Sequence, residues 1–109
     1  MNEKELILQK LTLLKPEIMQ SYHITSLALF GSFARGEQTR NSDVDLLVDF
    51  SNTPDLLRFI ELEEKIKAVL GRNVDLVPRR KLRAELFEQI ESEKIAVLNA
   101  LMSFVSIGK

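Results

Sequence analysis

Three short apolar runs, set between longer segments of helical periodicity, constrain the fold of this chain more than any other sequence feature. The runs cover 26–30, 45–50 and 73–77. The first is followed by a glycine, the second is followed by a serine and an asparagine, and the third begins with an asparagine. Short apolar runs bounded by turn-forming residues are typical of buried strands, so a strand is expected at each of them.

Apolar residues also recur at helical spacing outside these runs. In segment 6–18 they stand at spacings of one, three and four, which predicts an amphipathic helix. Pro16 should bend this helix or begin a second one, because proline lacks the amide donor that a helix interior needs. The same periodicity predicts a later helix within 82–90.

A further helix is marked by signals at both of its ends. Thr53 and Pro54 fit an N-cap and a first helical residue, and Gly71 fits the C-cap after Leu70. Helices that alternate with short strands favour an α/β or α+β fold, in which a small mixed β-sheet is covered by helices. A length of 109 residues favours a single domain over residues 1–109.

Composition and charge exclude several classes of protein. Fifteen basic and sixteen acidic residues leave no global positive field, so direct binding of nucleic acid is not expected. The absence of cysteine and of a secretory signal fits a protein of the reducing cytoplasm. The uncharged stretch 95–108 is too short to cross a membrane. It is expected to form a final strand or helix docked on the core, or else a partner interface.

The polar segment between the first two predicted strands carries the candidate chemistry. Segment 31–45 reads GSFARGEQTRNSDVD. Gly31 and Ser32 directly follow a strand, where a backbone without a Cβ atom and a hydroxyl beside amide donors can hold phosphate oxygens. The spacing of a P-loop is missing, and an ordinary glycine-serine turn is the alternative.

Asp43 and Asp45 stand two residues apart at the entrance of the second predicted strand. In extended backbone, residues at this spacing point to the same face, so their carboxylates converge. Converging carboxylates, together with substrate phosphates, suit Mg2+ and can bridge two ions. A solvated acidic turn is the alternative, while a calcium-binding EF-hand loop is excluded by the apolar residues at 46–48.

Asp75 lies within the third predicted strand, where an acid without a partner is costly to bury. Beside Asp45 it would complete a triad of carboxylates for metal binding and catalysis. An exposed face of an edge strand could also carry it without any such role. His23 is the one histidine of the sequence and lies upstream of this region, so it is interpreted as a structural or surface residue.

These residues carry a resemblance to a known family. The segments GSFARG and SDVDLLV, followed by a lone aspartate in a later strand, resemble the DNA polymerase beta nucleotidyltransferase superfamily. Within it, they resemble the minimal nucleotidyltransferase (MNT) antitoxins of HEPN/MNT toxin-antitoxin pairs. The resemblance implies that Gly31 and Ser32 hold the triphosphate of ATP. It also implies that Asp43 and Asp45 bind two Mg2+ ions, and that Asp75 completes the set and assists the attacking oxygen.

The same resemblance implies a reaction and a partner. The chain would transfer AMP from ATP to a tyrosine hydroxyl of a HEPN-domain ribonuclease toxin, with which it could form a hetero-oligomer. Two alternatives stay open, which are a non-catalytic antitoxin that acts by binding alone and a transferase for a small, aminoglycoside-like molecule. Arg35 and Glu37 also match family positions and are expected to pair and hold the loop, or else to contact the ligand. The basic residues of 79–83 are interpreted as a solvated face, or else as a contact for an acidic partner.

Overall fold

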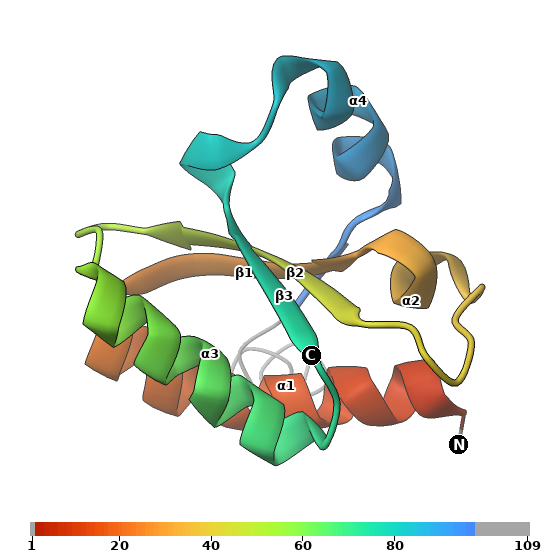
Figure 1. Ribbon diagram of the computed structural model, residues 1–109, viewed down its shortest axis with the longest axis horizontal. Coiled ribbons are helices and arrows are strands. Elements are labelled where there is room, and N and C mark those ends of the chain that lie inside the picture. Colours follow the sequence, from red (N-terminus) through yellow and green to blue (C-terminus); the bar gives the residue numbers. More distant parts are fainter. Residues whose placement is uncertain (1, 98–109) are drawn as a thin grey trace, which may run out of the picture.

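The computed structural model describes residues 2–97, so Met1 and residues 98–109 lie outside the described part of the chain. Within that part, helices largely alternate with strands (Figure 1). In chain order the elements are α1 Glu3–Tyr22, β1 Ile24–Phe30, α2 Gly31–Arg35, β2 Val44–Phe50, α3 Leu56–Leu70, β3 Val74–Pro78, the 3-10 helix η1 Arg79–Lys81, α4 Ala84–Glu93 and β4 Ile95–Ala96. None of these helices is long and apolar enough to span a membrane.

The strands form one mixed sheet with the order β3-β2-β1-β4. β1 pairs antiparallel with both β2 and β4, whereas β2 and β3 run parallel and are connected through α3. A parallel pair needs such a crossover because a hairpin cannot join strands that run in the same direction. The predicted small mixed sheet covered by helices is therefore confirmed, with β3 at one edge.

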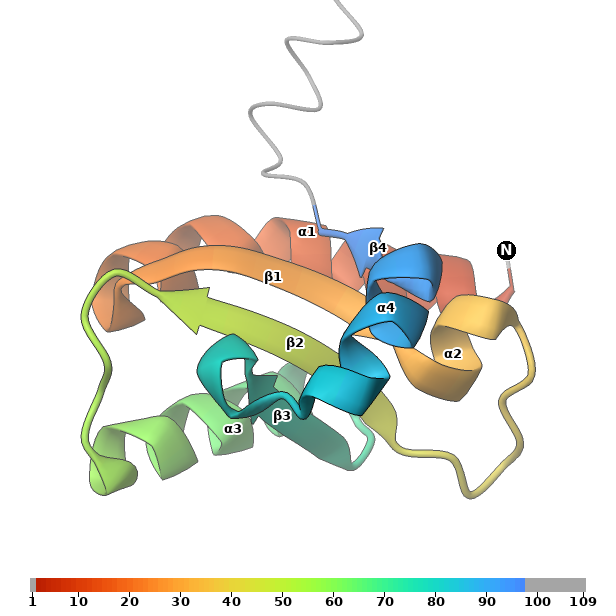
Figure 2. The same cartoon turned by 90° about the horizontal axis from the view of Figure 1, so that it is seen from above.

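Helices cover the two faces of the sheet unequally. α1 and α3 lie on one face and α4 lies over the other (Figure 1, Figure 2). A small apolar cluster of Ala28, Leu47 and Ile90 forms on the α4 side. Successive residues of a strand point to opposite faces, so Asp45 shares the α4 face with Leu47. The larger core on the other face includes Leu11, Ile18, Leu29, Leu46, Val48, Leu62 and Ile66.

Each predicted strand is present, within two residues of its expected limits. The beginning of the uncharged tail forms β4, and the buried Val97 follows it. The Val97 N–H donates to the Leu27 carbonyl at 2.8 Å, and the Lys15 Nζ atom donates to the Val97 carbonyl. A docked strand is thus confirmed for the described start of the tail, and residues 98–108 of that stretch lie outside the described residues.

The predicted break at Pro16 is wrong, because α1 continues through this residue. Leu11 and Leu14 before the proline and Ile18 after it all pack into the larger core. Burial of this apolar stripe offsets the one main-chain hydrogen bond that proline cannot make.

The predicted N-cap at Thr53 is also wrong, because α3 begins only at Leu56. Asp55 is the N-cap, and its side chain accepts the Arg58 N–H at 2.8 Å. A carboxylate suits this place because it also interacts favourably with the positive end of the helix dipole. Gly71 is confirmed as the C-cap, with a φ of +68°.

Replacement of the proline inside α1 should stabilise the protein. A proline in a helix interior costs about 3 kcal/mol, while it restricts the unfolded chain by about 1 kcal/mol. We therefore expect Pro16→Ala to raise the free energy of unfolding by roughly 1–2 kcal/mol, measured by urea denaturation followed by circular dichroism. Pro54→Ala, which lies outside any helix, is the control and should bring no gain. An unchanged midpoint for Pro16→Ala would mean that α1 accommodates its proline without cost.

Candidate active site

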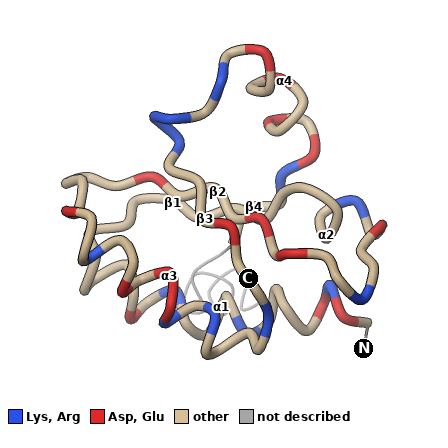
Figure 3. The backbone as a smooth tube through the Cα atoms, in the orientation of Figure 1, with Lys and Arg blue, Asp and Glu red and all other residues tan. Residues whose placement is uncertain are grey.

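Asp45 and Asp75 are direct neighbours on the parallel strands β2 and β3. Residues paired in register share one face, so both carboxylates project from the α4 face of the sheet. Asp43 lies immediately before β2, two residues ahead of Asp45. The pairing therefore brings Asp45 and Asp75 together where β2 and β3 begin, and acidic stretches of the two strands lie side by side (Figure 3).

The acids differ in their exposure to solvent. Asp45 is partly buried, whereas Asp43 and Asp75 are exposed. Of the two placements considered for Asp75, the exposed face of an edge strand is the one observed, so this acid carries no cost of burial. The functional interpretation of Asp75 depends instead on its place beside Asp45.

The Asp45 carboxyl is the most perturbed of these groups. Burial, together with the charges of Asp75 and Asp43, raises the pKa of the Asp45 carboxyl to about 6. The Arg35 guanidinium lowers this pKa in part, and Glu93 raises it further. A nearby cation would favour the ionised form of such a carboxyl. Acids perturbed in this way mark candidate functional sites.

Gly31 packs directly against Asp45. A Cβ atom at this glycine would lie 2.1 Å from the Asp45 Oδ2 atom, too close for any side chain. The residue also has a φ of +74°, a left-handed conformation that favours glycine. Its place follows from the antiparallel pairing of the preceding Phe30 with Asp45. The glycine-serine turn at Gly31 and Ser32 therefore adjoins the acids.

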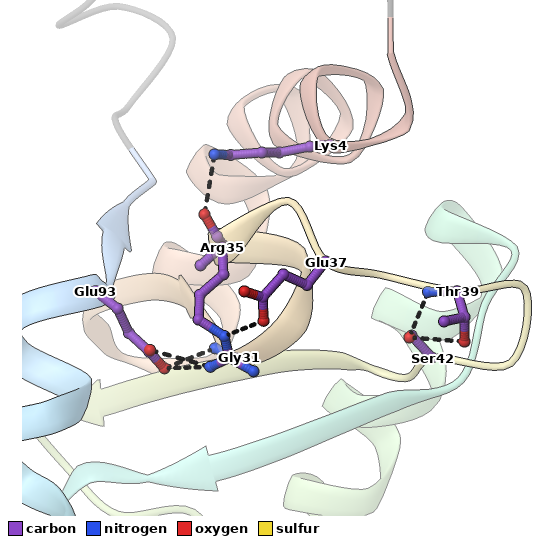
Figure 4. A network of polar contacts seen from close by, with 8 residues as sticks. Lys4, Gly31, Arg35, Glu37, Thr39, Ser42 and Glu93 are labelled. Carbon is purple, nitrogen blue, oxygen red and sulfur yellow. Dashed lines mark hydrogen bonds and ion pairs between the residues drawn. The ribbon is translucent and has the colours of Figure 1, made fainter.

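Glu93, which was not expected from the sequence, connects this turn to α4 (Figure 4). Its Oε1 atom accepts the Gly31 N–H at 3.2 Å, and its Oε2 atom accepts from Arg35 Nη1 at 3.0 Å. Arg35 Nε also donates to Glu37 at 2.8 Å, which confirms that these two residues pair. Glu93 lies 62 residues after Gly31 in the sequence, and no motif spacing indicates their contact.

The acids supply the right kind of ligand for Mg2+ without forming a complete cage. Within residues 2–97, no three acidic, histidine or cysteine side chains are grouped closely enough to hold a metal ion alone. Mg2+ is usually held by one or two carboxylates, with substrate phosphates and water filling its other positions. Asp43 and Asp45 can supply oxygen ligands of this type, so the site fits a metal that arrives with a triphosphate.

A polar groove lies beside Asp43, between the loop that precedes β2 and the end of α3. Basic and acidic side chains both line it, so it suits a ligand that carries charge. Its lining residues are Arg40, Asn41, Ser42, Asp43, Glu64, Lys67, Ala68, Gly71, Arg72 and Asn73.

Known proteins share the sequence pattern of this chain. Residues 13–97 match the nucleotidyltransferase domain family. The protein adenylyltransferase MntA of Thermococcus cleftensis is 42% identical over 87 residues, which cover 80% of this chain and 88% of that protein.

Solved structures share its fold. A chain described as a minimal nucleotidyltransferase superposes with a TM-score of 0.70 at 34% identity, over 87% of this chain and 95% of the other. A chain from the complex of tri-AMPylated Shewanella oneidensis HEPN toxin with MNT antitoxin has a TM-score of 0.62. It is 22% identical and covers 92% of this chain and 76% of its own length, a likeness that shows the fold alone.

The close contact at Gly31 can be tested against a second glycine with the same backbone conformation. Gly36 has a φ of +71°, but a Cβ atom there would meet nothing within 4 Å. Gly36→Ala should therefore lower the free energy of unfolding by about 1–2 kcal/mol, which is the cost of placing alanine in a left-handed conformation. Gly31→Ala should lose roughly a further 1–3 kcal/mol because Asp45 must move. Equal losses in urea denaturation would argue against the contact.

The raised pKa of Asp45 predicts a specific dependence of stability on pH. The pKa of Asp45 is about 6 in the folded protein and 3.8 ordinarily. Between these pH values the folded protein therefore holds more protons at Asp45 than the unfolded chain does. This group therefore weakens the fold as pH rises from about 4 to about 6, and the loss persists above that range. Asp45→Asn removes the effect, so its gain in unfolding free energy should be larger near pH 7.5 than near pH 4.5. A gain that is equal at both values would contradict the assignment.

Proposed function

Since this chain belongs to the nucleotidyltransferase domain family, we propose that it is a Mg2+-dependent protein adenylyltransferase. It transfers AMP from ATP to a tyrosine hydroxyl of a HEPN-domain ribonuclease toxin, with release of pyrophosphate and the hydroxyl proton, and so acts as its antitoxin in the cytoplasm. Two likenesses support this assignment. The relative MntA is named a protein adenylyltransferase, and one structural neighbour comes from a complex that contains an AMPylated HEPN toxin.

The observation that carries the proposal is the in-register pair of Asp45 and Asp75 beside Gly31. It joins two carboxylates to a turn at which the missing side chain lets the Asp45 carboxylate lie against the backbone. Transfer of a nucleotidyl group depends chiefly on positioning and on neutralisation of charge. A small domain with these few groups is therefore sufficient for the reaction.

Each residue has a distinct part in the proposed reaction. Gly31 and Ser32 hold the triphosphate, and the Gly31 N–H must leave Glu93 before it can donate to a phosphate oxygen. Asp43 and Asp45 bind Mg2+, two ions being proposed. Asp75 completes the ligand set and orients the acceptor hydroxyl. Bound Mg2+ would supply positive charge that neutralises the triphosphate and the crowded carboxylates.

The exposure of Asp75 favours a protein acceptor over a small molecule. Asp75 lies on the edge strand β3 and is open to solvent, so a bulky acceptor can reach it. Small molecules are usually bound in concave pockets that enclose most of their surface. A partner that brings its own tyrosine to this edge would form a hetero-oligomer with the chain.

The basic residues that follow β3 are partly neutralised within the domain. Arg79 pairs with Glu91 at 3.2 Å and lies over the Phe87 ring, 5.4 Å from its centroid. Arg83 lies 4.0 Å from Glu85. Arg79 is thus held within the domain by Glu91 and Phe87, and we propose no direct role for it in binding nucleic acid.

The proposed transfer predicts covalent labelling of the toxin. With ATP labelled on its α-phosphate, Mg2+ and a HEPN-domain toxin as the acceptor, the toxin should gain label that resists denaturation. Asp43→Ala should abolish this labelling, because a metal ligand is lost. Asp49→Ala is the matched control, since Asp49 lies on β2 four residues beyond Asp45 and should leave labelling intact.

The same experiment separates the alternatives. Labelling that survives Asp43→Ala would remove this residue from the mechanism. A toxin that is bound and inhibited without label would identify a non-catalytic antitoxin. Label found on an aminoglycoside but not on the protein would identify a small-molecule transferase.

A further inference from the structure

Arg72, in the turn between α3 and β3, contacts parts of the chain that are far apart in sequence. Its Nη1 atom donates to the Ser42 carbonyl at 2.8 Å and to the Arg40 carbonyl at 3.3 Å. Its guanidinium also forms an ion pair with Glu3 and lies over the Phe33 ring, 4.9 Å from the centroid. The side chain is only 20% exposed, so these contacts hold it in one place.

These contacts fix the loop that ends at Asp43. Ser42 immediately precedes Asp43, and its carbonyl belongs to the peptide group that joins the two residues. The loop is also closed on itself, because the Ser42 Oγ atom accepts the Thr39 N–H at 2.8 Å (Figure 4). Arg72 is thus bound directly to the backbone next to Asp43.

Asp43 needs such support more than the other acids do. Asp45 and Asp75 lie inside strands and are positioned by the hydrogen bonds of the sheet. Asp43 lies outside β2, so its place depends on the loop before it and on the Val44 N–H, which donates to the Asn73 carbonyl at 2.9 Å. Asn73 directly follows Arg72, so a single turn holds the backbone on both sides of Asp43.

Phe33 gives Arg72 a rigid base. This ring is fully buried in α2, the short helix that begins at Gly31. The ion pair with Glu3 partly neutralises the guanidinium from the first turn of α1. Among the described contacts of Arg72 there is no hydrogen bond to Asp43, so the Asp43 carboxylate keeps its oxygens for another ligand.

We propose that Arg72 is a positioning residue, which sets the place of Asp43 relative to Asp45 and thereby the affinity of the site for a divalent cation. This inference rests on the proposed role of Asp43 as a metal ligand. Arginine is required because its planar fork binds two carbonyls and a carboxylate while it stacks on a ring. Lysine at this position would keep the charge and lose that geometry. Residues that orient metal ligands typically change metal affinity by about 10–100-fold when they are replaced.

Arg58 supplies a matched control. Its guanidinium also lies over a buried ring, that of Tyr22 at 4.5 Å, and donates to a carbonyl, that of Ser21 at 2.8 Å. It also forms an ion pair with Glu61 at 3.0 Å. Arg58 thus has the same kinds of contact as Arg72, on α3 and away from the acids. A general loss of stability should therefore occur in both lysine variants, although Arg58 is more exposed, at 47% against 20% for Arg72.

The test compares Arg72→Lys with Arg58→Lys by two measurements. The first is binding of Mn2+, as a substitute for Mg2+, in the presence of a non-hydrolysable ATP analogue, followed by electron paramagnetic resonance. We expect affinity for Mn2+ to fall about tenfold or more in Arg72→Lys and to stay unchanged in Arg58→Lys. The second is hydrogen exchange at the amides of 40–43, which should accelerate only in Arg72→Lys. Thermal melting checks that both variants fold.

Unchanged exchange at 40–43 in Arg72→Lys would overturn the inference, as would faster exchange with unchanged Mn2+ affinity. An equal loss of Mn2+ affinity in both variants would overturn it too, because a structural role would then suffice. If Asp43→Ala binds Mn2+ as tightly as the unaltered protein, the proposed metal role of Asp43 fails, while exchange at 40–43 still decides whether Arg72 orders the loop.

Discussion

Mutual repulsion between Asp45 and Asp75 is the constraint on which the rest of the site depends. Parallel pairing of β2 with β3 places these carboxylates side by side, and like charges in such positions destabilise a sheet. The fold tolerates this arrangement because both strands also contribute to the large apolar core on the opposite face. The proposed binding of a cation would relieve this unfavourable pair of acids.

The charged groups around Asp45 pair with one another and do not neutralise the two aspartates. Within residues 2–97, Arg35 is the basic group that lowers the pKa of Asp45, yet it is engaged by Glu93 and Glu37. Glu93 in turn occupies the Gly31 amide, so a negative group already lies where a phosphate is proposed to bind. Binding of a metal and a triphosphate would therefore replace internal contacts with external ones of the same kind, instead of filling an empty space.

Local patterns predicted most of this arrangement, and tertiary contacts account for what they missed. The strands were predicted from short apolar runs. The shared direction of Asp43 and Asp45 was predicted from their spacing, because residues two apart in extended backbone point to the same face. The fit of Gly31 against Asp45 could not be read from the sequence, because it depends on the register of β1 with β2. Pro16 was misjudged for a related reason, since burial of its helix outweighs the local cost. The contacts of Glu93 and Arg72 join distant segments and leave no periodic signal.

The parallel pairing of β2 with β3 also limits how the length of this chain can vary. A shift of β3 by one residue would turn Asp75 to the α3 face and bring an apolar neighbour beside Asp45. Between Asp45 and Asp75, the loop at 51–55 is exposed along most of its length and belongs to no helix or strand. Insertions and deletions among evolutionary variants should therefore accumulate in that loop, because they leave the register of β2 with β3 unchanged there.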